Sequence, residues 1–173
     1  MEFIQVVARR RMVREFTDEP IPNDVVMQIL EVAHRSPSAG HLQPQEFIIV
    51  RNAEQKRKLA RAALSQMFIA QAPVVIVVCS DTRRNVWRYG KRGRDFYSII
   101  DGAFASMLIL LACTNLGLGA CFVGAFDDEE VSRVLNLPCE VRPIGIIPIG
   151  KSAKKPEKLG RRPLKEIIHY EQW

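Results

Sequence analysis

Histidine and cysteine are scarce in this sequence of 173 residues, which has three of the first and four of the second. No two cysteines have the C-x-x-C spacing, and no histidine lies at zinc-ligand spacing, so we predict no bound metal. Three of the cysteines, Cys79, Cys113 and Cys121, have apolar neighbours. We therefore expect buried free thiols, which fit a reducing compartment, and the sequence excludes a small disulfide-held protein.

Aromatic residues are also few, at 8%, and a long apolar run is missing. The longest such run, residues 103–113, is shorter than the roughly 20 residues that span a membrane. The first residues, Met1 to Ile4, lack the basic start and the long apolar core of a signal peptide. These absences predict a soluble, cytoplasmic protein that does not enter a membrane.

What the sequence does contain is enough for one folded unit. Hydrophobic residues make up 47% of it and charged residues 25%, a balance that excludes a disordered chain and a collagen-like repeat. At about 150 residues per domain, the length predicts a single domain over residues 1–173. Residues 151–173 are rich in Lys and Pro and apolar only near their end, so we expect an extended arm that docks on a neighbouring subunit.

The formal net charge is +6, and the basic residues are concentrated rather than spread. Most of them fall in three stretches, 9–14, 83–94 and 151–165. Such placement favours local anion sites over a uniformly basic surface. A non-enzymatic nucleic-acid-binding module is a remote alternative, because aromatic residues are few and no known nucleic-acid-binding motif is present.

Apolar periodicity alternates between helix and strand. Asn23 is expected to cap one helix, and Asp127 forms a capping box with Glu130 ahead of another. Residues 98–115 are apolar on nearly every side, which predicts a long helix buried in the core or between subunits. The expected helices are 23–35, 53–66, 98–115 and 127–135, the expected strands are 46–50, 74–79, 120–123 and 144–149, and 81–94 is expected to be a loop. This irregular mixture predicts an α+β protein with a sheet of about four strands.

Three stretches carry residues suited to binding a small anionic molecule. The first holds Arg10, Arg11 and Arg14. Guanidinium groups bind phosphate through two parallel hydrogen bonds, and a helix would put Arg10 and Arg14 on one face. A solvated basic face is the alternative interpretation.

The second stretch, 36–44, places Ser38, His41 and Gln43 between two prolines, where an ordinary helix-to-strand loop is the alternative. The third, 117–126, surrounds a short strand with glycine and alanine, which would let a flat ring lie against the backbone. Its spacing differs from the dinucleotide-binding G-x-G-x-x-G fingerprint. Tight packing of sheet on helix is the alternative there.

These stretches, in this order, resemble the nitroreductase family of FMN-dependent oxidoreductases over essentially the whole chain. No single motif is specific to this family, but five motifs in the family's order along one chain are. The similar segments are R-R-M-V-R-E-F at 10–16, S-P-S-A-G-H-L-Q-P at 36–44, F-I-A-Q-A-P-V-V-I-V-V at 68–78, D-G-A-F-A-S-M-L-I-L-L-A at 101–112 with G-L-G-A-C-F-V-G-A-F after it, and R-R-P-L-K-E-I-I at 161–168.

The resemblance implies an α+β sandwich with a mostly antiparallel central sheet. It implies a homodimer with FMN at the subunit interface, where the long helix also lies. The implied FMN-binding residues are Arg10, Arg11, Arg14, Val123 and Gly124, with Pro37, Ser38 and His41 from the other subunit and Arg161 or Arg162 completing the phosphate site. The implied activity is NAD(P)H-dependent reduction of nitroaromatics, quinones or similar acceptors by ping-pong hydride transfer. The flavin carries this chemistry, so we assign no catalytic side chain.

The sequence also departs from the family pattern. Met12 stands where Ser or Thr is usual, and His41 where Asn is usual. The excursion that forms a substrate lid in larger members is reduced to about residues 81–96. A specialised flavoenzyme of the same family, of the reductive dehalogenase, ene-reductase or flavin-cutting type, is therefore the alternative. The basic stretch 83–94 is expected to draw in the phosphates of NAD(P)H.

Overall fold

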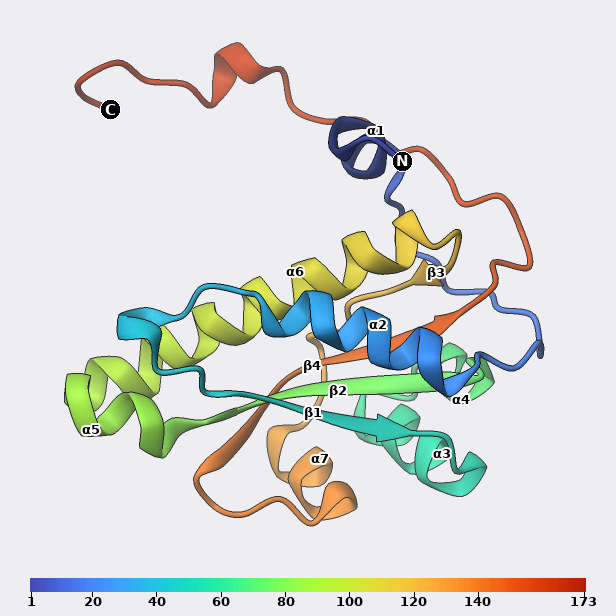
Figure 1. Cartoon of the computed structure of the whole chain (residues 1–173), viewed down its shortest axis with the longest axis horizontal. Coiled ribbons are helices and arrows are strands. Elements are labelled where there is room, and N and C mark those ends of the chain that lie inside the picture. Colours follow the sequence, from blue (N-terminus) through green and yellow to red (C-terminus); the bar gives the residue numbers. More distant parts are fainter.

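The structure, a computed structural model, describes all 173 residues and is built around one four-stranded antiparallel sheet (Figure 1). The strands are β1 (Gln45–Val50), β2 (Val74–Asp81), β3 (Gly119–Ala120) and β4 (Val141–Gly150), in the order β1-β2-β4-β3. The central strands β2 and β4 are rich in Val and Ile, which suits strands covered on both faces. The predicted α+β class and four strands are confirmed, although β3 is shorter than expected.

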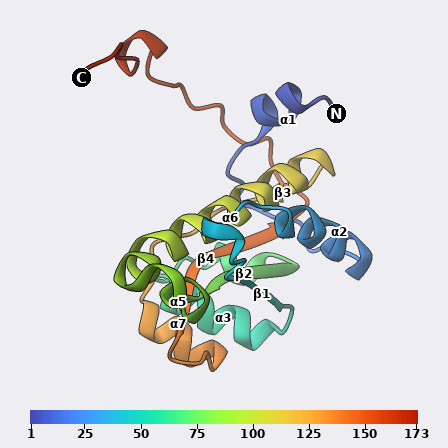
Figure 2. The same cartoon turned by 60° about the vertical axis from the view of Figure 1, so that its left-hand side comes forward.

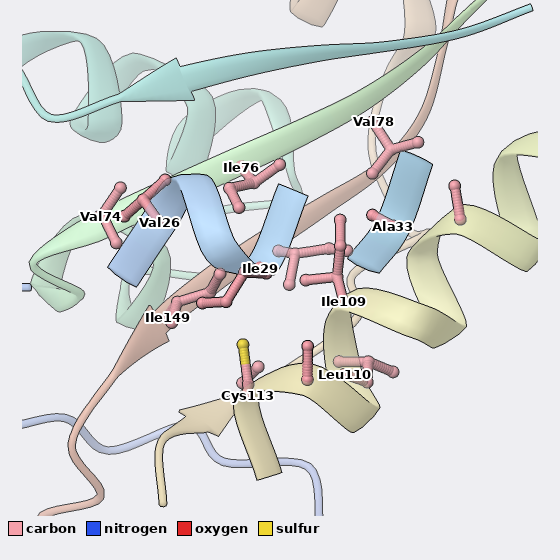
Figure 3. Packing of buried hydrophobic residues seen from close by; sticks show 14 of the residues in the cluster. Val26, Ile29, Ala33, Val74, Ile76, Val78, Ile109, Leu110, Cys113 and Ile149 are labelled. Carbon is pink, nitrogen blue, oxygen red and sulfur yellow. The ribbon is translucent and has the colours of Figure 1, made fainter. Parts of the chain in front are cut away.

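Helices cover both faces of this sheet. On one face lie α2 (Asn23–His34) and α6 (Ser98–Asn115), and on the other lie α3 (Ala53–Ala62), α4 (Phe68–Gln71) and α7 (Asp128–Leu135). The alternation of side chains along β2 divides the two cores, because Ile76 joins the α2 and α6 side while Val77 joins the other. Figure 3 shows the first core, where Ile29 of α2 and Ile109 of α6 pack near the β2 side chains.

Helix α6 spans the length predicted for it and buries one face. Ala105, Ile109 and Cys113, spaced four residues apart, are fully buried, while Phe104 and Met107 are exposed. With the helical turns that precede it, the segment Thr82–Asn115 is long and apolar enough to cross a membrane. Half of its most apolar stretch is buried inside the protein, as in the core helix of a globular fold.

The prediction of a loop over 81–94 is wrong. This segment forms α5 (Thr82–Arg92) and a π-helical turn, η2 (Gly93–Tyr97), that leads into α6. The side chain of Asp81 caps α5 by accepting the Arg83 N–H at 3.1 Å. Basic and polar residues dominate α5, and this composition led to the prediction of a loop although the helix is amphipathic.

Smaller corrections concern the ends of helices. Asn23 is the first residue of α2 rather than its cap, and it makes no capping hydrogen bond. The helix expected over 53–66 ends at Ala62. Asp127 caps α7 as predicted, by accepting the Glu130 N–H at 2.8 Å. The capping box is only half formed, because the Glu130 carboxylate pairs with an arginine of its own helix.

Both ends of the chain project from the sheet (Figures 1 and 2). Helix α1 (Phe3–Arg9) lies near the C-terminal end of α6, where the terminal amino group donates to Asn115 Oδ1 at 3.0 Å. The residues after β4 form the expected arm, whose base is held where the Ala153 N–H donates to the Glu15 carbonyl at 3.0 Å. Beyond it the chain is exposed apart from Pro156, with one 3-10 turn, η3 (Leu164–Glu166).

Candidate functional site

The arginine segment 10–14 lies beside the glycine-containing segment that follows α6. The Val13 N–H donates to the Ala120 carbonyl at 2.9 Å, and the Phe122 N–H points to the Met12 sulfur at 3.4 Å. A Cβ added at Gly119 would lie 2.8 Å from Val13 side-chain carbons, so only glycine permits this approach. Two of the three stretches singled out in the sequence therefore meet.

The arginines of this segment form no ion pair with a carboxylate. Arg10 is half-buried, and its Nη1 atom is buried without a hydrogen-bond partner. Arg11 Nη1 donates to the carbonyls of Ala8 and Arg10, each at 2.8 Å, which fixes its orientation. Arg14 is exposed, with its guanidinium 5.9 Å from the centre of the Phe68 ring. Residues 10–14 are extended rather than helical, with Met12 bridged to Ala120, so the helix face that would pair Arg10 with Arg14 is not formed. Arginines without a carboxylate partner are still suited to a bound anion.

The charge of Arg14 also reaches the thiol of Cys121. Burial raises the pKa of Cys121, and the positive charge of Arg14 partly lowers it again. Cys79, Cys113 and Cys121 are buried and free, as predicted, whereas Cys139 is exposed. The thiol under the arginine segment is thus a neutral packing group.

The segment after β3 offers free backbone donors, the N–H groups of Gly124, Ala125 and Phe126. Val123 is buried, and its N–H and carbonyl both bond to Ile146, at 2.9 and 3.0 Å. Gly124 follows it and is exposed, and its N–H makes no hydrogen bond in the structure. The Phe122 ring packs so closely over Gly145 that a Cβ there would overlap it. The small residues therefore serve packing of Phe122 as well as access to the Gly124 N–H.

The loop 36–44 lies at the other end of α6 from the arginine segment (Figure 1). Within it, Ser38 Oγ accepts the Gln43 N–H at 2.9 Å, and the His41 ring nitrogen Nε2 lies 2.7 Å from the Gln43 side-chain amide. Pro37 and His41 are exposed. One chain thus does not bring Pro37, Ser38 and His41 to the arginines, in keeping with the expectation that they belong to the partner's site.

The arginines of the arm also stay apart from the rest of the chain. Arg161 and Arg162 are exposed, and neither forms a hydrogen bond or ion pair with the body of the protein. Arg162 bonds only to Glu166, one turn further along the arm, with 3.7 Å between Nε and the carboxylate. A phosphate site that includes either arginine needs the arm to dock elsewhere.

Two polar residues behind the loop 36–44 went unnoticed in the sequence. Asp101, in the first turn of α6, is 2% exposed, and Asn85 of α5 is fully buried. Asp101 Oδ1 accepts the Ala39 N–H at 3.0 Å, and Oδ2 accepts the Asn85 amide at 3.0 Å. The available signal was a lone carboxylate in an otherwise apolar helix, which is costly to bury unless it is hydrogen-bonded.

Arginines without ion pairs, beside a segment with free backbone N–H groups, define a protein suited to binding an anionic cofactor or substrate. Comparison with known proteins narrows this assignment. The sequence model of the nitroreductase family matches residues 7–71 and 64–151. The chain belongs to the nitroreductase family.

The names of similar proteins are consistent with membership of this family. An FMN reductase [NAD(P)H] of Bacillus subtilis is 30% identical over 99% of this chain and 74% of its own length. An NADH dehydrogenase of Thermus thermophilus is 29% identical over 92% and 91%. The crystal structure of a nitroreductase family protein from Clostridium difficile 630 is 30% identical, covers both chains completely and superposes with a TM-score of 0.89.

Proposed function

We propose that this chain is an FMN-dependent oxidoreductase that uses NAD(P)H to reduce a small-molecule acceptor such as a nitroaromatic or a quinone. The observation that carries the proposal is the arginine segment, where Arg10 and Arg14 lack any carboxylate partner and Arg10 Nη1 is buried without a hydrogen bond. The phosphate of FMN is an anion of the kind that such guanidiniums bind in pairs. The relatives named as FMN reductase and NADH dehydrogenase support the same cofactor and donor.

The protein's part in the reaction is to bind and orient the reactants. When bound, FMN would supply the redox chemistry between NAD(P)H and the acceptor, with the two substrates using one site in turn. Arg10 and Arg14 would bind its phosphate, and Arg11, fixed by two carbonyls, would add a positive charge that favours the reduced anionic cofactor. The Gly124 N–H, exposed and without a partner, would be available to the flavin ring, beside the buried Val123. No side chain needs to act as an acid or base.

The site is completed by a second copy of the chain. The loop carrying Pro37, Ser38 and His41 lies at the opposite end of α6 from the arginine segment, so a site that uses both needs two subunits. Exposed apolar side chains on α6, notably Phe104 at 47% and Met107 at 42%, support a homodimer that covers this helix.

The arm belongs to the same assembly. Its exposed Ile167, Ile168 and Trp173 lie beyond the body of their own chain, and docking them on the partner would bury apolar surface. In that position Arg161 or Arg162 would join the phosphate site. Residues 1–173 then form one nitroreductase domain with an exchanged arm, and the buried free thiols suit a cytoplasmic enzyme.

The visible absorption spectrum tests the cofactor assignment. The purified protein, or the protein after incubation with FMN and removal of the excess, is expected to show a bound flavin band that bleaches when NAD(P)H is added without air. Initial rates against both substrates should give parallel lines in a double-reciprocal plot. A protein that stays colourless after FMN is added would refute the proposal.

Sedimentation of surface variants tests the dimer. Phe104→Glu on α6 is expected to yield a monomer with weakened FMN binding, because it buries a charge in the interface. Leu64→Glu is the matched control, since Leu64 is 71% exposed and lies just beyond α3, on the face of the sheet opposite α6. Dimers of equal stability in both variants would exclude this face of α6.

A further inference from the structure

The loop 36–44 adopts a backbone conformation that it would not hold by itself. Gly40, His41 and Gln43 have φ of 57°, 58° and 50°. Positive φ is unfavourable for His and Gln, and two such residues within three positions mean that surrounding contacts impose the shape. The loop contains His41 and Ser38, the residues proposed to reach the partner's flavin, so these contacts decide where they lie.

Contacts to α5 hold the outer side of the loop. The Arg84 guanidinium donates to the Leu42 carbonyl at 3.0 Å, and Arg88 donates to the Gly40 carbonyl at 3.5 Å. A Cβ added at Gly40 would lie 2.6 Å from the Tyr89 hydroxyl, so the loop backbone lies directly against the helix. These contacts involve exposed or half-buried side chains and carbonyl acceptors only.

Asp101 accepts the one hydrogen bond that joins the loop to a buried acidic side chain. Its carboxylate is 2% exposed, faces no cation, and accepts the Ala39 N–H and the Asn85 amide with one oxygen each, both at 3.0 Å. Hydrogen bonds to a buried ionised group are stronger than neutral ones, and a carboxylate left without them is costly to bury. Asp101 therefore ties the start of the loop to both α5 and α6.

Several buried polar atoms in this part of the protein have no hydrogen-bond partner. Gln45 and Ser80 face each other across β1 and β2, at the same end of the sheet as α5 and the start of α6, and both are buried. The side-chain polar atoms of Gln45, Ser80 and Ser36, and Oδ1 of Asn85, have no hydrogen-bond partner.

We propose that Asp101 is a positioning residue, which acts with Asn85 to hold Ala39 and so places Ser38 and His41 for the flavin of the partner subunit. The proposal rests on the proposed function for its consequence, since the loop matters to FMN only in the homodimer. It assigns Asp101 no contact with FMN or substrate. It couples the conformation of α5 to the flavin site, because Asn85 belongs to that helix.

Exchange of the two side chains tests the proposal. Asp101→Leu removes both acceptor oxygens at nearly the same side-chain shape, and Asn85→Leu removes the amide donor, so each single variant loses the bond between the two side chains. The double variant, Asn85→Asp with Asp101→Asn, retains a carboxylate–amide pair in the opposite sense and leaves an oxygen for the Ala39 N–H. Asp128→Asn, which removes an exposed carboxylate from the first turn of α7, is the control.

Two measurements on the full-length protein separate anchoring from cofactor binding. Hydrogen exchange of the Ala39 amide, followed without FMN, is expected to accelerate about tenfold or more in both single variants and to slow again in the double variant. The FMN dissociation constant is expected to rise about tenfold or more in the single variants and to recover in the double variant. The control should match the wild type in both.

The contrary outcomes are distinct. Unchanged exchange at Ala39 in the single variants, or a double variant as impaired as either single one, would overturn the anchor. Faster exchange with unchanged FMN affinity would overturn its role in placing the loop for the flavin. A wild-type protein that binds no FMN would refute the proposed function, and the exchange rate at Ala39 would still decide whether the anchor exists.

Discussion

Replacing Arg10 by Gln separates a cofactor-binding role from a structural one. Arg10 Nη1 is buried and has no hydrogen-bond partner in the protein. A buried donor without a partner costs roughly 1–3 kcal/mol of folding free energy. The FMN-free protein should therefore lose little on substitution, because the missing charge removes this cost while the shorter side chain loses some packing. We expect its unfolding free energy to stay within about 1 kcal/mol of the wild type or to exceed it.

The loaded protein should respond in the opposite direction. A hydrogen bond to a charged group contributes about 1.5–3 kcal/mol, and about 1.4 kcal/mol corresponds to tenfold in affinity. No ion pair has to break before Arg10 binds phosphate, so the full contribution should appear in FMN binding. The FMN dissociation constant is expected to rise roughly 10-fold to 150-fold, with a weaker dependence on salt than in the wild type.

The assay is FMN titration by quenching of flavin fluorescence, paired with urea unfolding of the FMN-free protein. Arg57→Gln is the matched control, because Arg57 is an exposed arginine of α3 without an ion pair. The control should leave both quantities unchanged. An Arg10→Gln protein that is destabilised without FMN yet binds it with wild-type affinity would refute the reasoning, because Arg10 would then serve the fold alone.

Three further predictions concern stability and the electron donor. Ile109→Ala should lower the unfolding free energy by about 2–5 kcal/mol in urea unfolding, because Ile109 is fully buried between α2 and the sheet; a loss below 1 kcal/mol would contradict the packing. Burial raises the pKa of the Cys79 and Cys113 thiols to about 12 from 9.0. Because the unfolded thiols ionise first, the unfolding free energy should decline as pH rises from about 9 to 12, and a flat profile between pH 8 and 11 would be inconsistent with their burial. Lys91→Gln on the exposed face of α5 should raise the KM for NAD(P)H about twofold to fivefold with kcat unchanged, an effect that added salt should erase; an unchanged KM at low salt would remove α5 from donor binding.

The sequence by itself determined which segments form the central strand and the long core helix of this protein. The β-branched run at 74–79 and the apolar segment at 98–115 each admit one kind of element, and the structure has β2 and α6 there. Order and motif content also predicted the family, because five weak motifs in register carry more information than any one of them. The arginine segment was proposed as an anion site on residue type alone, because guanidinium groups suit phosphate wherever they lie.

Helix α5 depended partly on tertiary structure. Asp81 caps it locally, but Asn85 is buried against Asp101, a residue 16 positions later. The Gly124 N–H is free because Val123 bonds to Ile146 of a strand far along the chain. Contacts between residues distant in sequence decide these features, so periodicity and spacing carry no trace of them. The same holds for the loop 36–44, whose residues the sequence supplied and whose shape only the packing of α5 and α6 imposes.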